Sequence, residues 1–575
     1  MRLSAYCTAH DAQRLLDPEQ QQRALGILRD LSVERVIVET NRGDQAVAEA
    51  DLRTLRDFFE GEGFEVMGGI ATVPGENWGV AANEGLAWLN FEHPKTQADL
   101  EAAMRAAARV FDAYVVDDFL LSGDRSAISD AARRGRDWPE YRRDLTTAIS
   151  QRIFIDAAKE ENPDIRMILK FPQSYDRYHV FGYDVERHPQ LYDAVWVGTE
   201  TRGQYTQRFG FTQPYEGFVN YRWIDSLSGG KLEAAWFDHG DCDGPDFVEQ
   251  AWQTVLAGAR DIVLFSYAAL ADSHPGHELL RQDLAGLRAL AEAVRAAPVT
   301  GVAGYKPPNS DPVSDMYIMD FIGMLGIPVV PVSEFPHASK RIFAPAYGAR
   351  DPEIANHIEA ALHGGKTVIV TTGLLANAVE GDRLAKLAGL AEAPAVAHLR
   401  TESVLVDGAA VHVPRGLDVG GRIAPQAAEV LLEALDGDTP VPFLTEHHVG
   451  SGRLLVLNLH MFTQEDFDAV NEVLLSPRNL GLLDLPEAWA SVLRDRFGGG
   501  GERLVLAPTR VTIQPLGESG WFIQNYNNTP ATVRLDVSGL PAGSLRDGFT
   551  GGAIEASGHV IERTMPARSR WWVAR

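Results

Sequence analysis

Acidic side chains follow several apolar runs of this sequence. The runs in residues 112–118 (DAYVVDD), 192–200 (YDAVWVGTE) and 231–238 (KLEAAWFD) end in Asp117 and Asp118, in Glu200 and in Asp238. Two carboxylates on either side of one bond can divide the work of breaking it. One donates a proton to the leaving oxygen, while the other attacks carbon or activates water. If the runs are strands that end at one rim, these residues are candidates for such a pair.

Other polar groups follow the remaining apolar runs, and their density exceeds what chance would place there. We expect this set to bind substrate: His10, Asp11, Glu39, Asp117, Lys170, Arg202, Trp236, Asp238 and Tyr267. Indole rings stack on the C–H faces of sugars, and strand ends would present Trp78 and Trp236 as walls of the site. Trp196 lies inside a run and is expected to pack in the core.

The adjacent acids Asp117 and Asp118 cannot both face the same side of a strand, because neighbouring side chains alternate. We expect Asp118 to be the reacting carboxylate and Asp117 to be structural. Lys170, one strand away, is a cation that could keep Asp118 ionised. The alternative is that both acids only begin a polar loop.

A metal centre is the main alternative use of these acids. Such a centre could draw on His10, Asp11, Glu39, Asp118, Asp238, His239 and Asp241. However, the first run carries the single histidine of CTAHD, whereas metal-dependent barrels commonly carry His-x-His there. The sequence has no HExxH motif and no phosphate-binding P-loop. We therefore expect neither a metal nor another cofactor, and a metal-dependent hydrolase remains an alternative.

The elements that must position these residues form a regular series. Eight apolar runs alternate with mostly helical segments, at residues 3–8, 33–40, 64–73, 112–118, 165–171, 192–200, 231–238 and 261–267. Nearly continuous apolar runs are typical of parallel strands covered on both faces. The series predicts an N-terminal (β/α)₈ TIM barrel over residues 1–297. A doubly wound open sheet is the alternative.

The pattern changes after the barrel. Strands and helices alternate again over residues 298–495, which predicts a separate α/β domain, and FGGGGERL then indicates a flexible linker. Residues 502–575 alternate apolar and polar positions without a helical pattern, which predicts a small β-sandwich.

Composition narrows the partners. The 575 residues carry a formal net charge of -26, which disfavours nucleic acid. No apolar run approaches the length of a membrane span, and the N-terminus lacks the pattern of a signal peptide. The two cysteines, Cys7 and Cys242, provide no disulfide framework. We expect a cytoplasmic protein that contacts no membrane.

The order barrel, α/β domain and β-sandwich resembles glycoside hydrolase family 42, the bacterial β-galactosidases. The closest similarity lies in LGIPVVPV, HGGKTVIVTTGLL and HVGSGRLLVLN of the middle segment. The resemblance implies an amidotransferase-like middle domain of the trimerisation type, and hence a homo-oligomer, dimer or trimer. Because no cysteine lies between residues 243 and 575, thiol amidotransferase chemistry is excluded.

The barrel departs from that family at the fourth strand. The family has a glutamate there, usually after an asparagine, whereas this sequence has Asp117 and Asp118. The barrel instead resembles those of α-galactosidases and α-glucosidases in the position of its acids. That resemblance implies that Asp118 is the nucleophile and Glu200 the acid/base.

These observations predict a glycoside hydrolase of the EC 3.2.1 type, exo-acting on a terminal sugar by a two-carboxylate mechanism. A non-catalytic carbohydrate-binding protein is a further alternative. The sugar, its anomer and the choice between retention and inversion stay open. So does the identity of the reacting pair among Asp117, Asp118, Glu200 and Asp238.

Overall fold

The computed structural model describes residues 1–84, 88–117, 119–203, 213–297, 299–462, 480–498, 504–538 and 545–575. The described chain falls into two compact units. The first comprises residues 1–203 and 224–292, and the second comprises residues 213–223, 293–297 and the described residues from 299 onward. Of the predicted domain boundaries, Pro298 and residue 502 lie outside the described residues. The three-domain division therefore stays a prediction.

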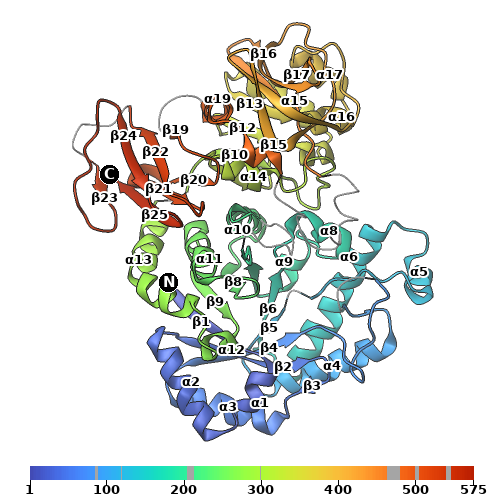
Figure 1. The fold of residues 1–575 in the computed structure, drawn as a ribbon. Coiled ribbons are helices and arrows are strands. Elements are labelled where there is room, and N and C mark those ends of the chain that lie inside the picture. The colour runs from blue at the N-terminus through green and yellow to red at the C-terminus, as the bar shows by residue number, and fades with distance from the viewer. Residues whose placement is uncertain are drawn as a thin grey trace. The chain divides into compact units, whose positions relative to one another are not determined.

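The first unit is built on a closed parallel barrel (Figure 1). Its strands are β1 (Arg2–Cys7), β2 (Arg35–Arg42), β4 (Glu65–Ala71), β5 (Ala113–Val116), β6 (Arg166–Phe171), β7 (Ala194–Gly198), β8 (Leu232–Asp238) and β9 (Asp261–Phe265). They pair in chain order, and β1 pairs with both β9 and β2, which closes the ring. The (β/α)₈ prediction is confirmed, and the open sheet is wrong. The short strand β3 (Gln45–Ala46) pairs antiparallel with the end of β2.

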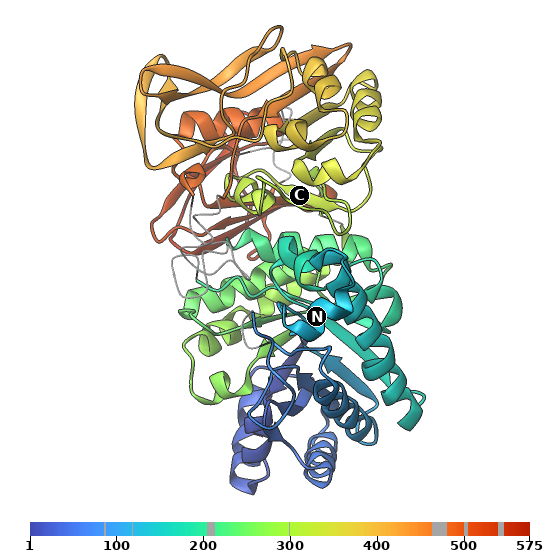
Figure 2. The same ribbon diagram turned by 90° about the vertical axis from the view of Figure 1, so that its right-hand side faces the viewer.

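Helices alternate with the strands along the chain, and those of the first unit surround the barrel (Figure 2). They are α1 (Ala9–Arg14), α2 (Pro18–Asp30), α3 (Glu49–Gly61), α4 (Pro94–Ala108), α5 (Ala127–Arg133), α6 (Trp138–Ile149), α7 (Ala157–Glu161), α8 (Tyr178–Phe181), α9 (His188–Leu191), α10 (Tyr215–Leu227), α11 (Gly244–Ala257), α12 (Tyr267–Ala271) and α13 (Gly276–Ala296). A π-helical segment, Ser150–Asp156, joins α6 to α7. Among the described helices, none is long and apolar enough to cross a membrane.

Large side chains fill the barrel interior. The buried cluster contains Tyr6, Ile37, Met67, Val115, Ile168, Ala194, Trp196, Ala234, Trp236 and Val263. Trp196 is in this core, as predicted. Trp236 packs here too: it is only 3% exposed, and its ring centroid lies 4.6 Å from that of Tyr6. The barrel is therefore a packed core, and a substrate can reach only its rim.

The second unit begins with a nine-stranded mixed sheet. Its parallel strands are β10 (Val302–Tyr305), β11 (Val329–Val332), β12 (Arg341–Ala344), β13 (Thr367–Thr371) and β18 (Gly452–Leu457). Two hairpins extend it, β14 (Leu399–Val406) with β15 (Ala409–Val419) and β16 (Glu429–Asp436) with β17 (Thr439–Val449). Its helices are α14 (Ile318–Met324), α15 (Ile354–His363), α16 (Thr372–Asn377), α17 (Gly381–Leu387) and α19 (Glu487–Gly498).

The C-terminal part is a β-sandwich, as predicted. One sheet contains β19 (Leu504–Leu506), β22 (Ala531–Asp536) and β24 (Val560–Met565). The other contains β20 (Val511–Pro515), β21 (Gly520–Asn525), β23 (Arg546–Asp547) and β25 (Ser569–Ala574). Residues of both sheets, among them Trp521, Val533 and Trp571, share one buried core.

Candidate active site

A buried ion pair lies at the carboxyl ends of neighbouring strands β6 and β7. Lys170, on β6, places its Nζ 2.6 Å from Oε1 of Glu200, which follows β7. The side chain of Lys170 is 1% exposed and that of Glu200 is 4% exposed. The ammonium also lies 4.2 Å from the ring centroid of Trp236. The structure thus pairs Lys170 with Glu200, a contact that strand positions alone did not predict.

Gln173 and Arg202 connect this ion pair to the next strand. In the amide orientation that satisfies both of its polar groups, Gln173 donates to Glu200 Oε2 (2.9 Å) and accepts from Arg202 Nη1 (3.1 Å). Arg202 also donates twice to Asp238 at the end of β8, from Nε to Oδ1 (3.1 Å) and from Nη2 to Oδ2 (2.7 Å). The set Lys170, Gln173, Glu200, Arg202 and Asp238 therefore forms one network, which we call the rim network.

Charges within the rim network support one another. Burial works against the charged form of Arg202, but the carboxylates of Asp238 and Glu200 outweigh burial and raise the pKa of the guanidinium. Backbone groups add to the support of Asp238, whose Oδ1 also accepts from Gly240 N (3.0 Å). The network therefore places two carboxylates, each paired with a basic side chain, at adjacent strand ends.

A second polar cluster lies at the end of β2. The carboxylate of Glu39 is fully buried and accepts from Tyr6 OH (2.8 Å), Ala9 N (2.7 Å) and twice from Arg42 (3.0 and 2.7 Å). Burial raises the pKa of Glu39, and Arg42 opposes that rise. The side chain of Arg42 is 25% exposed, and its guanidinium lies over the ring of Phe265. The sequence prediction included Glu39 but not Arg42 among the site residues, although Arg42 also lies at the end of this strand, three residues after Glu39.

Of the two aspartates after β5, only Asp117 is among the described residues. Asp118 lies outside the described residues, so its predicted reacting role is untested. Asp117 is 2% exposed, and its Oδ1 accepts from Thr72 N (3.1 Å), Thr72 Oγ1 (3.3 Å) and Phe119 N (3.3 Å). These contacts tie the ends of β4 and β5 together, which fits the structural role expected for Asp117.

The remaining candidates belong to helix starts around the rim. Asp11 is in the first turn of α1, where its carboxylate accepts from Thr8 N (3.0 Å) and Thr8 Oγ1 (2.8 Å) in a capping box. His10 is exposed on the same helix, and Tyr267 begins α12 and is 5% exposed. His239 contacts the carbonyl oxygen of Phe265 (3.2 Å). Among the described residues, no three His, Cys, Asp or Glu side chains are placed to hold a metal ion.

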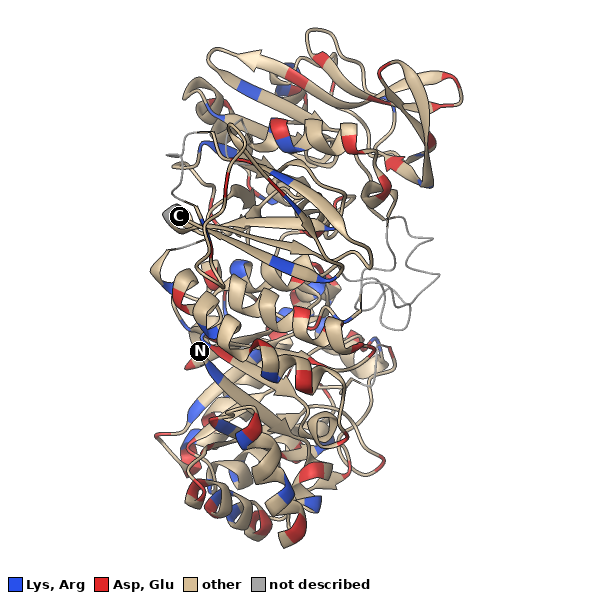
Figure 3. Ribbon diagram, turned by 60° about the vertical axis from the view of Figure 1, so that its left-hand side comes forward, with Lys and Arg blue, Asp and Glu red and all other residues tan. Residues whose placement is uncertain are grey.

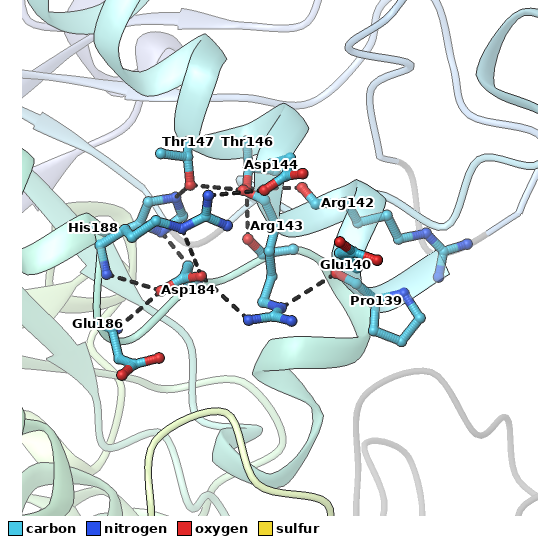
Figure 4. A network of polar contacts seen from close by, with 12 residues as sticks. Pro139, Glu140, Arg142, Arg143, Asp144, Thr146, Thr147, Asp184, Glu186 and His188 are labelled. Carbon is cyan, nitrogen blue, oxygen red and sulfur yellow. Dashed lines mark hydrogen bonds and ion pairs between the residues drawn. The ribbon is translucent and has the colours of Figure 1, made fainter. Parts of the chain in front are cut away.

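The loop that carries Gln173 is held to helix α6 (Figure 4). Asp184 accepts from Glu186 N (3.0 Å), from Arg187 N and Nε (2.8 and 2.9 Å) and from Arg143 Nη1 (3.4 Å). His188 contacts Thr147 Oγ1 (3.5 Å). These contacts join residues 184–188 of the connection between β6 and β7 to helix α6.

With this geometry in place, comparison with known proteins shows what kind of barrel it is. Residues 1–285 match the family described as probable glycosyl hydrolase, catalytic domain. The barrel thus belongs to the family of probable glycosyl hydrolase catalytic domains. Residues 300–462 match the second domain of the uncharacterized protein SSO3021. That protein, from Saccharolobus solfataricus, is 24% identical over 362 residues, which cover 57% of this chain and 59% of the relative.

Solved structures share the whole architecture. A β-galactosidase from Bacillus circulans sp. alkalophilus is similar with a TM-score of 0.66 at 13% identity, covering 100% of this chain and 99% of the other. The same coverage and TM-score, at 14% identity, are found for α-L-fucosidase isoenzyme 2 from Paenibacillus thiaminolyticus. Gan42B, a family 42 β-galactosidase from G. stearothermophilus, is similar with a TM-score of 0.63 at 13% identity, covering 100% and 98%. The fold of this glycoside hydrolase is thus like that of family 42.

Proposed function

We propose that this glycoside hydrolase is exo-acting and removes a terminal sugar by a two-carboxylate mechanism at the carboxyl rim of the barrel. The observation that carries the proposal is the buried Lys170–Glu200 pair, which prepares one carboxylate at this rim. Asp118, predicted from the sequence, is the second reacting group of the proposal. Asp238 and Arg202 then contribute to the binding of the sugar or to the order of the rim network.

The similar structures support the exo part of the proposal. They include β-galactosidases, an α-L-fucosidase and an exo-β-1,4-mannosidase from Opitutaceae bacterium strain TAV5, the last with a TM-score of 0.52 over 80% of this chain.

A substrate screen tests this proposal. The purified protein is incubated with nitrophenyl glycosides of galactose, glucose, fucose, mannose and rhamnose in both anomeric series, with and without EDTA. Oligosaccharides labelled at the reducing end follow for the best sugar. We expect release of single sugars, unchanged by EDTA. Internal fragments would contradict the exo action, and loss of activity with EDTA would favour the metal-dependent alternative. Binding without hydrolysis would indicate a carbohydrate-binding protein.

A further inference from the structure

We propose that Lys170 is a positioning residue that holds Glu200 as a carboxylate, so that Glu200 works as the ionised partner and not as the proton donor. This inference rests on the proposed function and deepens it. It differs from the role that the resemblance to α-galactosidase barrels implies, in which Glu200 is the acid/base. Lys170 then acts through Glu200 and does not bind the sugar.

The geometry of Lys170 carries the first step. Its side chain is 1% exposed, and a donor–acceptor distance of 2.6 Å joins its ammonium to Glu200 Oε1. Trp236 covers the ammonium on another side. Removing the charge of one partner from a buried ion pair leaves the other charge uncompensated, which is strongly unfavourable. Protonation of Glu200 in the resting enzyme would leave the buried ammonium of Lys170 without a compensating charge.

The other described groups around Glu200 act in the same direction. Gln173 donates to Oε2 of Glu200, whereas Lys170 donates to Oε1. Arg202 accompanies Gln173 and adds a second cation near Glu200. The nearest acid in this network, Asp238, is itself paired with Arg202 at 2.7 Å. Both oxygens of Glu200 thus accept hydrogen bonds, whereas a proton donor needs one oxygen to carry the proton toward the leaving group.

The reaction follows from an ionised Glu200. In a retaining enzyme a carboxylate oxygen forms a bond to the anomeric carbon as the bond from that carbon to the leaving oxygen breaks. The electron pair of the broken bond stays on the leaving oxygen, which takes the proton of the second carboxylic acid. Water then gives a proton back to that second carboxylate and bonds to the anomeric carbon, which frees Glu200. In an inverting enzyme, Glu200 instead takes the proton of the attacking water. Both routes need the ionised form that Lys170 stabilises.

Matched substitutions of Lys170 test the inference. Lys170→Met removes the charge and keeps most of the length, while Lys170→Arg keeps the charge. We expect the acid limb of the pH profile of kcat/KM to move upward by about one pH unit or more in Lys170→Met. In Lys170→Arg it should stay near the wild-type position. A merely structural lysine would lower activity without moving the limb, so an unmoved limb in a folded Lys170→Met variant would overturn the inference.

A second measurement keeps the test decisive if Lys170→Met does not fold. Glu200→Gly opens space beside the anomeric carbon, and sodium azide can then replace the missing group with an activated aryl glycoside. If Glu200 is the nucleophile, the glycosyl azide has the anomeric configuration opposite to that of the substrate. If Glu200 is the proton donor, the azide product retains the configuration, which would overturn the inference.

The two proposals fail in different ways. A wild-type protein that hydrolyses no glycoside defeats the proposed function, and with it the role of Lys170. An active wild-type enzyme whose folded Lys170→Met variant keeps its acid limb defeats only the role of Lys170.

Discussion

Asp117 shows how an acidic residue at a catalytic rim can serve the fold. Its carboxylate oxygen receives three hydrogen bonds from Thr72 and Phe119, and the side chain is almost fully buried. In Asp117→Asn the charge that strengthens these bonds is lost. We expect the free energy of unfolding to fall by about 1–2 kcal/mol, with turnover changed only a few-fold. Urea denaturation and steady-state kinetics measure the two effects.

The matched control is Asp112→Asn, at the exposed beginning of the same strand region. It should change the free energy of unfolding by less than about 0.5 kcal/mol. A stable but inactive Asp117→Asn enzyme would contradict the structural role and make Asp117 a reacting carboxylate.

The residues at the rim could be predicted from the sequence wherever the end of a strand could be predicted. Lys170, Glu200 and Asp238 were found because apolar runs end beside them, and the barrel brings these three together. Their pairing was not predictable, because it depends on side-chain direction and on the loop that carries Gln173. Trp236 was expected as a wall of the site, but the barrel interior has room for large rings and its indole is buried there.

At the scale of elements, the connection from β6 to β7 contains a buried histidine that makes the stability of the fold depend on pH. His188 is fully buried between that loop and α6, and burial lowers its pKa to about 4, with Asp184 opposing and Arg187 assisting the shift. In the unfolded chain this histidine takes up a proton near pH 6.5, but in the folded protein it does so only near pH 4. The unfolded state therefore binds more protons in this window, and stability falls as the pH is lowered through it.

Replacing His188 tests this pH dependence. Between pH 7 and pH 5 the wild type should lose about 2 kcal/mol of stability that His188→Asn does not lose. Denaturant unfolding at the two pH values measures the difference. His363→Asn is the matched control, because the side chain of His363 is 64% exposed and its loss should leave the pH dependence unchanged. Equal losses in the wild type and in His188→Asn would contradict the burial argument.

Element prediction was accurate for strands and less so for one long helix. Apolar runs placed the eight barrel strands nearly at their observed positions. The apolar pattern of residues 145–163 predicts a helix there, but the observed helix begins earlier, at Trp138, because Asp137 caps its N-terminus and Pro139 suits its first turn. Its π-helical segment has no sequence signal that period counting could detect, and Tyr192 contacts Ser150 at the start of that segment.

On the scale of the whole molecule, the net charge of -26 is dispersed. Acidic and basic residues are interspersed along the elements of the chain (Figure 3). Such a surface favours solubility and does not oppose a neutral sugar. The layer architecture was predictable because periodicity changes along the chain from the barrel to the sandwich. The exact boundaries stay a prediction, since two of them fall outside the described residues.

The assembly state is a prediction at this scale. The resemblance of the middle segment to a trimerisation-type domain predicts a homo-oligomer, dimer or trimer, of this 575-residue chain. Light scattering coupled to size exclusion at micromolar concentration should give two or three times the chain mass. A monomer mass under those conditions would contradict the prediction, without bearing on the chemistry of the barrel.

The most direct test of the central claim is the turnover of Glu200→Gln on the best substrate of the glycoside screen. The matched control is Glu186→Gln, whose exposed side chain lies in the connection between β6 and β7. If Glu200 is a reacting carboxylate, kcat should fall by about a thousand-fold or more on activated aryl glycosides and on poor leaving groups alike. The control should keep wild-type turnover. A folded Glu200→Gln enzyme with wild-type kcat would contradict the account, because the rim network would then hold no reacting group at Glu200.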